Sequence, residues 1–160
     1  MKAHTAVGLA LYAVTLASCG GGKQSVEINT DVQPIATRWN GVLATPPELA
    51  GILQVSGQAW MGPDPKDLDR TQGYVNISNA VPGGQHPWHV HRGQCGSDKG
   101  ILGPADAYPL LKVQKDGRAN STARVPVPFP KTGEFFVNVH ASPKNLSTIV
   151  ACGNLAPPAR

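Results

Sequence analysis

Glycine and proline interrupt this chain at short intervals, and they limit the folds that it can adopt. Its 160 residues include 18 glycines and 15 prolines. Such punctuation favours short strands joined by tight turns over a bundle of helices. We therefore expect an all-β fold. A chain of this length, with 41% hydrophobic and 15% charged residues, has material for one core, so we expect one folded domain.

Alternating or densely apolar stretches predict the strands, and clusters of Gly, Pro and Asp predict the turns between them. Asp116-Gly117 predicts a tight hairpin turn. The prolines at 126, 128 and 130 restrict the strand before them to an edge. Residues 61–69 and 93–109 lack a stable period and are expected to be loops. The expected strands are 39–44, 51–60, 73–78, 88–92, 110–115, 118–127, 134–140 and 148–152.

Residues 1–18 have the pattern of a secretory signal, with Lys2, a short apolar run and small residues before Cys19. The apolar run is too short to span a bilayer. Residues 16–19, Leu-Ala-Ser-Cys, resemble the lipobox of bacterial lipoproteins, in which the cysteine is acylated. We expect Cys19 to carry a lipid anchor. The alternative is an ordinary signal peptide that happens to end near a cysteine.

This reading divides the chain into three parts. Residues 1–18 are the signal peptide, residues 19–37 are the lipidated cysteine and a flexible linker, and residues 38–160 are the folded domain. The expected location is the bacterial cell envelope, with the domain membrane-anchored and facing the periplasm. Gly20 stands where the lipoproteins that the chain resembles carry an aspartate for inner-membrane retention. The outer membrane is therefore favoured over the inner one.

Lipidation of Cys19 leaves two cysteines, Cys95 and Cys152. An even pair in an exported protein is typical of a disulfide, and we predict that these two form one. In the loop-entropy model a bridge across a loop of that length stabilises the fold by about 4 kcal/mol.

The formal charge is small, at +4 for the whole chain, and loss of residues 1–18 removes Lys2 and leaves +3. Lysine and arginine do not cluster with aromatic residues anywhere in the sequence. The chain therefore lacks the basic footprint of a nucleic-acid-binding protein.

Three histidines fall within residues 86–95, HPWHVHRGQC. On a strand, His89 and His91 point to one side, about 7 Å apart along the backbone, while Trp88 and Val90 point to the other. Two imidazoles on a rigid strand can converge on one metal ion. A solvent-facing or hydrogen-bonded pair is the alternative.

A third imidazole can join this pair. After loss of residues 1–18 the chain keeps four histidines, and His140 ends a separate, strongly apolar strand. If that strand lies beside the strand of His89, the result is a three-nitrogen site. Such a site suits copper or zinc and is unattractive to calcium or magnesium. The alternative is a polar histidine at a strand end.

Three segments resemble the Cu/Zn superoxide dismutases. Residues 82–95, PGGQHPWHVHRGQC, resemble the copper-binding strand of that family and the cysteine that follows it. Residues 137–143, VNVHASP, resemble its last copper ligand, and residues 147–155, STIVACGNL, its second cysteine. The resemblance extends over about residues 39–155.

The resemblance implies an eight-stranded Greek-key barrel or flattened sandwich. It also implies a structural role for His86, which ties loops together through backbone hydrogen bonds, and a disulfide within the subunit. The implied copper ligands are His89, His91 and His140, and the implied disulfide is Cys95 with Cys152.

The departures from the family concern zinc and the anion. The family's zinc ligands lie in the loop after the first cysteine, but residues 96–109 hold no histidine, only Asp98 and Asp106. Two carboxylates without nitrogen partners make a poor zinc site, so zinc is not expected. Ile149 stands where the family has an arginine that attracts superoxide. Alternation directs Arg92 away from the site, which leaves Lys144 as the better substitute.

We expect a copper-binding lipoprotein that holds, buffers or passes on copper, with a copper donor or acceptor protein as its partner. Three imidazoles with an open fourth position can accept both Cu(I) and Cu(II). One alternative is a copper-only superoxide dismutase of reduced efficiency, which converts superoxide to oxygen and hydrogen peroxide. Another is a β-sandwich binding domain without metal, in which the histidines form a hydrogen-bonded cluster.

Overall fold

The structure is a computed structural model, and it describes residues 37–52 and 54–158. The predicted signal peptide, the lipidation site at Cys19 and nearly all of the predicted linker lie outside these residues. Across the residues described, no helix has the length and apolar character that a membrane crossing requires.

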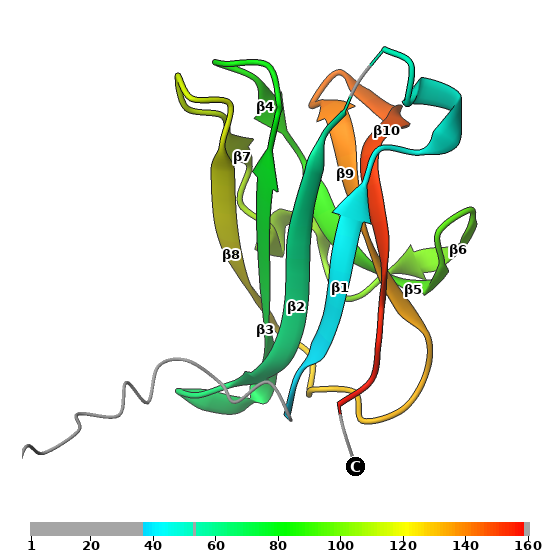
Figure 1. The fold of residues 1–160 in the computed structure, drawn as a ribbon. Coiled ribbons are helices and arrows are strands. Elements are labelled where there is room, and N and C mark those ends of the chain that lie inside the picture. The colour runs from blue at the N-terminus through cyan, green and yellow to red at the C-terminus, as the bar shows by residue number, and fades with distance from the viewer. Residues whose placement is uncertain (1–36, 53, 159–160) are drawn as a thin grey trace, which may run out of the picture.

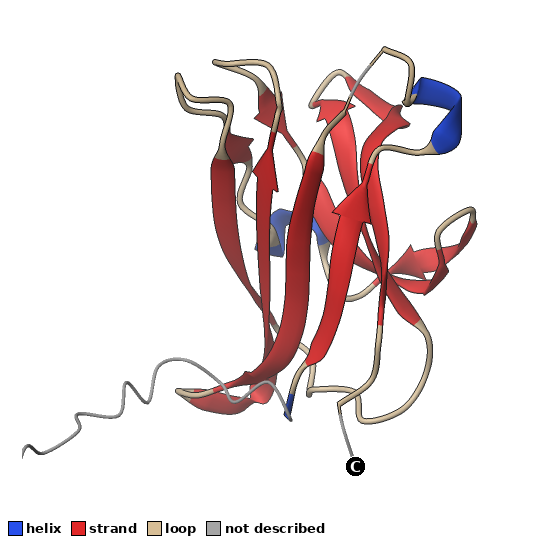
Figure 2. Ribbon diagram, in the orientation of Figure 1, coloured by secondary structure: helices blue, strands red, loops and turns tan. Residues whose placement is uncertain are grey.

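The fold is all-β, as predicted, and the helical elements η2 and η3 are short 3-10 turns (Figure 2). Eight strands form one antiparallel sheet in the order β6-β5-β9-β10-β1-β2-β3-β8, and the sheet curls into a half-barrel (Figure 1). Strands β4 and β7 pair separately. The bounds are β1 Trp39–Ala44, η2 Pro47–Leu49, β2 Ser56–Asp64, β3 Asp67–Ser78, β4 Gln85–His86, β5 Trp88–Gln94, β6 Ser97–Ile101, η3 Ala105–Ala107, β7 Leu111–Lys112, β8 Ala119–Val125, β9 Phe135–Ser142 and β10 Asn145–Leu155.

Alternation along the strands fills the interior of the curled sheet. In β8 every second residue is buried, as expected for a strand with one apolar face. Trp88 and Val90 of β5 and Val137 and Val139 of β9 are fully buried in the same core cluster. Because these side chains occupy the inner face, the residues between them are directed to the outer face of the sheet.

Two segments expected to be loops contain strands. Residues 61–69 lie in the hairpin of β2 and β3, which turns at Pro65 and Lys66. Residues 93–109 contain β6, which folds back onto β5. Both ribbons extend beyond the core, and the first four residues of β3 and of β6 are exposed. A strand exposed on both faces needs no alternation of apolar and polar residues. The hydrophobic pattern therefore could not predict the strands in these two segments.

The predicted hairpin around Asp116-Gly117 is correct at its turn and wrong in its pairing. Gly117 has a φ of +76°, a conformation that glycine adopts readily. The strand before the turn, β7, pairs with β4, whereas β8 pairs with β3. Val113 holds β7 in place through backbone hydrogen bonds with Gly83 and Gly84. Strand β8 lies at the edge of the sheet, as the prolines after it predict.

The position of β9 matters most for function, because β9 lies between β5 and β10. His89 is directly opposite Asn138, and Ile149 of β10 is directly opposite His140. His89 and His140, which are 51 positions apart in the sequence, therefore lie next to each other on the outer face of the sheet.

Candidate metal centre

Three histidines gather on the outer face of β5 and β9. They are His89, His91 and His140, and each offers one ring nitrogen such that these atoms all lie within 4.8 Å of one another. The ring centroids are 5.0 Å apart for His89 and His140, 5.7 Å for His89 and His91, and 6.2 Å for His91 and His140. All three side chains are buried. This group could hold a metal ion.

Hydrogen bonds fix which nitrogen of two rings is free. His91 donates from Nδ1 to a carboxylate oxygen of Asp98 at 3.0 Å, and His140 donates from Nδ1 to the carbonyl oxygen of Leu146 at 2.7 Å. Both acceptors lack a proton to give, so Nδ1 carries the hydrogen in each ring. The lone pair is then on Nε2 of His91 and of His140. Such partners typically orient metal-binding imidazoles and raise their basicity.

Ring nitrogens of the three histidines face one another. Because Nε2 of His140 carries a lone pair, Nδ1 of His89 donates a hydrogen bond to it at 3.1 Å. Nε2 of His91 is buried and has no hydrogen-bond partner among the described residues. A buried polar atom without a partner is costly, and a metal ion in this group would give Nε2 of His91 a partner.

Burial favours the neutral form of His89 and of His140. Burial lowers the pKa of His89 to about 4, with smaller contributions from the charges of His140 and His91. Burial also lowers the pKa of His140. Burial would raise the pKa of Asp98, but hydrogen bonds from the Gly100 backbone and from His91 hold it below its usual value. Neutral imidazole is the form that binds metal ions.

Aromatic rings support two of the histidines. Phe136 stacks on His91 with ring centroids 5.1 Å apart and planes inclined at 28°. Tyr108 meets His89 edge-on at 5.4 Å, and its hydroxyl donates to Leu102. These contacts restrict rotation of the rings, so the histidine group is held in place before any ion arrives.

His86 lies in β4, outside the three-histidine group. Its Nδ1 donates to the backbone carbonyl of His140 at 2.9 Å. The backbone amide of His140 donates to Pro87 at 2.8 Å. His86 and Pro87, just before β5, therefore bind both the carbonyl and the amide of the His140 backbone. These bonds fit the loop-tying role expected for His86.

The predicted disulfide is confirmed. Cys95 and Cys152 are bonded, with their Cα atoms 6.1 Å apart and 57 positions between them in the sequence. The backbone amide of Cys95 also donates to the side chain of Asn154 at 2.8 Å. The bridge joins the turn after β5 to β10, across β9, and so fastens the three strands that carry the site.

The remaining predicted residues are dispersed around the centre. Asp106 is exposed on η3, and Lys144 is exposed in the turn between β9 and β10. The exposed Arg92 donates to the carbonyl oxygen of Ile101. Ile149 is partly buried and is directly opposite His140 on the neighbouring strand.

Asp98 is the residue whose role the sequence analysis missed. It was considered only as a remnant of a zinc loop, but β6 brings its carboxylate to His91. Gly93, Gly96 and Gly100 all have positive φ values. This glycine spacing around a short polar segment was the available signal for a tight hairpin, because glycine adopts such angles without strain.

Comparison with protein-family models finds no match for this chain, and comparison with curated proteins likewise finds none.

Proposed function

We propose that this chain is a copper-binding protein of the bacterial cell envelope, with copper held by His89, His91 and His140. One observation carries the proposal. Nε2 of His91 is buried without a hydrogen-bond partner among the described residues, in a group of three histidines whose ligand atoms all lie within 4.8 Å of one another. A metal ion held by the three rings would give this buried lone pair a partner.

The donor set favours copper. Imidazole suits copper and zinc, and at equal geometry the divalent series gives copper(II) the higher affinity. Three nitrogens leave at least one position open, which allows both Cu(I) and Cu(II) to bind. The site has no thiolate, since both described cysteines are in the disulfide. A blue-copper electron-transfer centre would need one.

The likeness to the Cu/Zn superoxide dismutases is part of the proposal. It is supported by the three matching segments and by an eight-stranded antiparallel sheet that carries the histidine group on its outer face. A Greek-key barrel of that family is the architecture we propose. The lipid at Cys19 and a position on the periplasmic side of the outer membrane, rather than the inner one, remain proposals from the sequence.

Copper handling is favoured over catalysis because the surroundings do not attract an anion. Ile149 adjoins His140 where the family has its arginine. The carboxylate of Asp98 is bonded to His91 and places a negative group beside the centre. Superoxide is an anion, so it would approach without the steering that accelerates charged substrates. A carrier that exchanges copper with a partner protein needs no such steering.

Copper titration of the metal-free full-length protein tests the site. His140→Ala removes one of three ligands and is expected to weaken copper affinity by more than about 100-fold, since loss of an outer partner alone costs 10- to 100-fold. Ser142→Ala, two residues further along β9, is the matched control and should leave affinity unchanged. Equal affinity in wild type and His140→Ala would reject the site and favour a metal-free β-domain.

A superoxide assay on the copper-loaded protein separates handling from catalysis. Slow removal of superoxide is expected, because the anion-guiding cation is replaced by Ile149. Rates near the diffusional ceiling of about 10⁸–10⁹ M⁻¹s⁻¹ would instead establish the alternative, a copper-only superoxide dismutase.

A further inference from the structure

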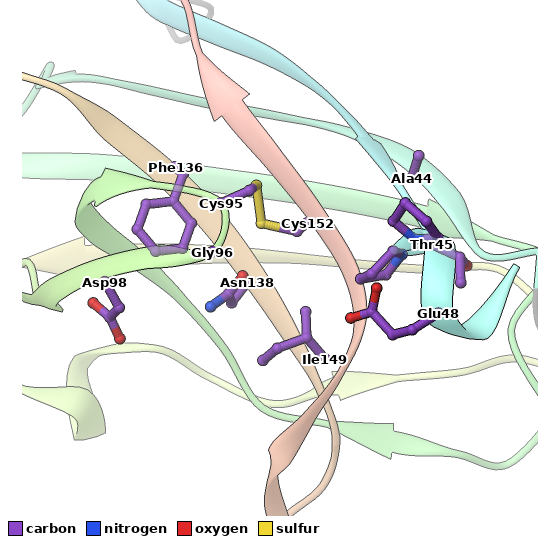
Figure 3. Close-up of a pocket in the computed structure, with 12 residues that line it drawn as sticks. Ala44, Thr45, Glu48, Cys95, Gly96, Asp98, Phe136, Asn138, Ile149 and Cys152 are labelled. Atoms are coloured by element: carbon purple, nitrogen blue, oxygen red, sulfur yellow. A yellow bond between two sulfur atoms is a disulfide. The ribbon is translucent and has the colours of Figure 1, made fainter.

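An apolar pocket lies next to the histidine group on the outer face of the sheet. Its volume is about 660 Å³, within the range of sites for small molecules. Figure 3 shows Phe136, Asn138, Ile149 and the Cys95–Cys152 disulfide among the side chains that line the pocket. Pro46 and Pro47, at the start of η2, form part of its wall.

The pocket contains an amide side chain without a hydrogen-bond partner among the described residues. Asn138 points into it from β9 and is 9% exposed. Its side chain makes no hydrogen bond to any described residue, although most buried side-chain amides find partners. Apolar side chains would serve packing better at this position. An amide held inside an apolar hollow is the arrangement by which binding sites orient a ligand.

The charges around the pocket have one sign. Glu48 on η2 and Asp98 on β6 line it from different sides, and the lining contains no lysine or arginine (Figure 3). Glu48 makes no ion pair with any described residue. One oxygen of Asp98 accepts from His91 and from the Gly100 backbone, and its side chain is 51% exposed. The pocket is therefore complementary to a cation and repels anions.

We propose that this pocket binds a small organic cation, namely an amine attached to an aromatic or similarly apolar body. The apolar body would pack against Phe136, Ile149 and the disulfide, the ammonium group would pair with Glu48, and a polar group would reach the amide of Asn138. Charge-assisted hydrogen bonds to a carboxylate are the strong kind. The pocket volume of about 660 Å³ is that of a small-molecule site, which favours a small molecule over a protein segment lying across the surface.

The occupant would lie beside the histidine group. Phe136 stacks on His91, and Ile149 pairs with His140 across the sheet. The proposal does not depend on copper, because every side chain that it uses is in place in the metal-free protein. It can therefore succeed or fail independently of the proposed function.

The test uses two probes of the same shape and opposite charge. The metal-free full-length protein, labelled with ¹⁵N, is titrated with 2-phenylethylamine and separately with phenylacetate. The amine is expected to shift the side-chain amide resonances of Asn138 in a saturable manner. Phenylacetate should bind at least about tenfold more weakly, because attraction to the carboxylates becomes repulsion.

Three variants locate the binding site. Glu48→Gln should weaken amine binding by about two- to fivefold, as for loss of an exposed ion pair. Glu134→Gln alters the other described glutamate, which lies outside the pocket, and should have no effect. Ile149→Arg fills the pocket with a cation and should abolish binding while the backbone spectrum stays that of the folded protein. If Ile149→Arg does not fold, Asn138→Leu replaces it and should also weaken binding, which is then followed through the backbone amide resonances of Gly96 and Ile149 in the pocket lining.

Three results would overturn the proposal. The first is equal binding of the amine and of phenylacetate, which removes the argument from charge. The second is amine binding that persists unchanged in both Glu48→Gln and the pocket-filling variant. The third is the absence of saturable binding by 2-phenylethylamine. If a lysine-containing peptide, titrated in the same way, binds where the amine does not, the occupant is a protein segment and the proposal is also overturned.

Discussion

The two faces of β5 and β9 differ in composition, although they are made from alternate residues of the same strands: the inner face is apolar, and the outer face carries the histidines. The inner face carries Trp88, Val90, Val137 and Val139, all fully buried in the hydrophobic core. The outer face carries three histidines together with Phe136 and Asn138. These outer residues are also largely buried, but Nε2 of His91 among them has no hydrogen-bond partner among the described residues.

We expect the inner face to contribute mainly to stability and the outer face mainly to binding. Apolar burial on the inner face contributes to folding in proportion to area. Buried imidazoles and an amide on the outer face contribute little to folding and instead create binding capacity. The comparison predicts that substitutions on the inner face change the free energy of unfolding, whereas those on the outer face change affinity.

The largest expected effect tests this division at two adjacent residues. Trp88→Ala should lower the free energy of unfolding by about 3–5 kcal/mol, because it empties a fully buried site. It also removes a hydrogen bond from the indole to Pro109. His89→Ala should cost about 1 kcal/mol, an ordinary value for a point substitution. Urea denaturation of the metal-free proteins measures both, and equal losses would contradict the division.

The disulfide comes next in size. Replacing Cys95 and Cys152 together by serine should lower the free energy of unfolding by about 2–4 kcal/mol, the usual range for a bridge of this kind. Copper affinity should change little by comparison, because neither sulfur belongs to the histidine group. Denaturation and copper titration of the same variant check both parts. Two free thiols in the denatured, non-reduced wild-type protein would show that the bridge does not form.

Asp98 tests whether the outer face is organised beyond its ligands. Asp98→Asn should weaken copper affinity by about 10- to 100-fold, the usual cost of losing a partner that orients a ligating histidine. The cause is loss of the charged acceptor for Nδ1 of His91. Asp106→Asn, an exposed aspartate on η3, is the control. If both variants bind copper as wild type does, Asp98 has no positioning role.

Ile149→Arg gives the smallest expected effect. In the copper-loaded protein it should raise the rate of superoxide removal by about tenfold at low salt, because a cation beside the centre steers the anion. The gain should shrink as ionic strength rises. Ile149→Leu keeps the apolar character and should leave the rate unchanged. A salt-independent rate in Ile149→Arg would argue against steering as the missing element.

The inner face was largely predictable from the sequence. Alternation around Trp88 and Val90 identified β5 and its two faces, and the apolar run up to His140 identified β9. Hydrophobic periodicity reports which side of a strand is buried, so it carries this information directly. The cysteine count was enough to predict the disulfide, which the structure confirms.

The outer face was predictable only in part. Pairing of β5 with β9 is a long-range property, so the meeting of His140 with the other two histidines was conditional on strand order. Asp98 reaches His91 because it lies on β6, a strand that is exposed on both faces and therefore shows no hydrophobic periodicity in the sequence. The pocket joins residues from η2, β6, β9 and β10, and no local pattern brings Glu48 and Asn138 together.

The central claim is that three imidazoles meet at one ion. Pulsed electron paramagnetic resonance of the protein loaded with one equivalent of Cu(II), prepared with ¹⁴N- and ¹⁵N-histidine, counts the coordinated rings. The account predicts three histidine nitrogens in the wild type and two in His140→Ala. A copper signal with fewer than three imidazoles, or one that His140→Ala leaves unchanged, would contradict it.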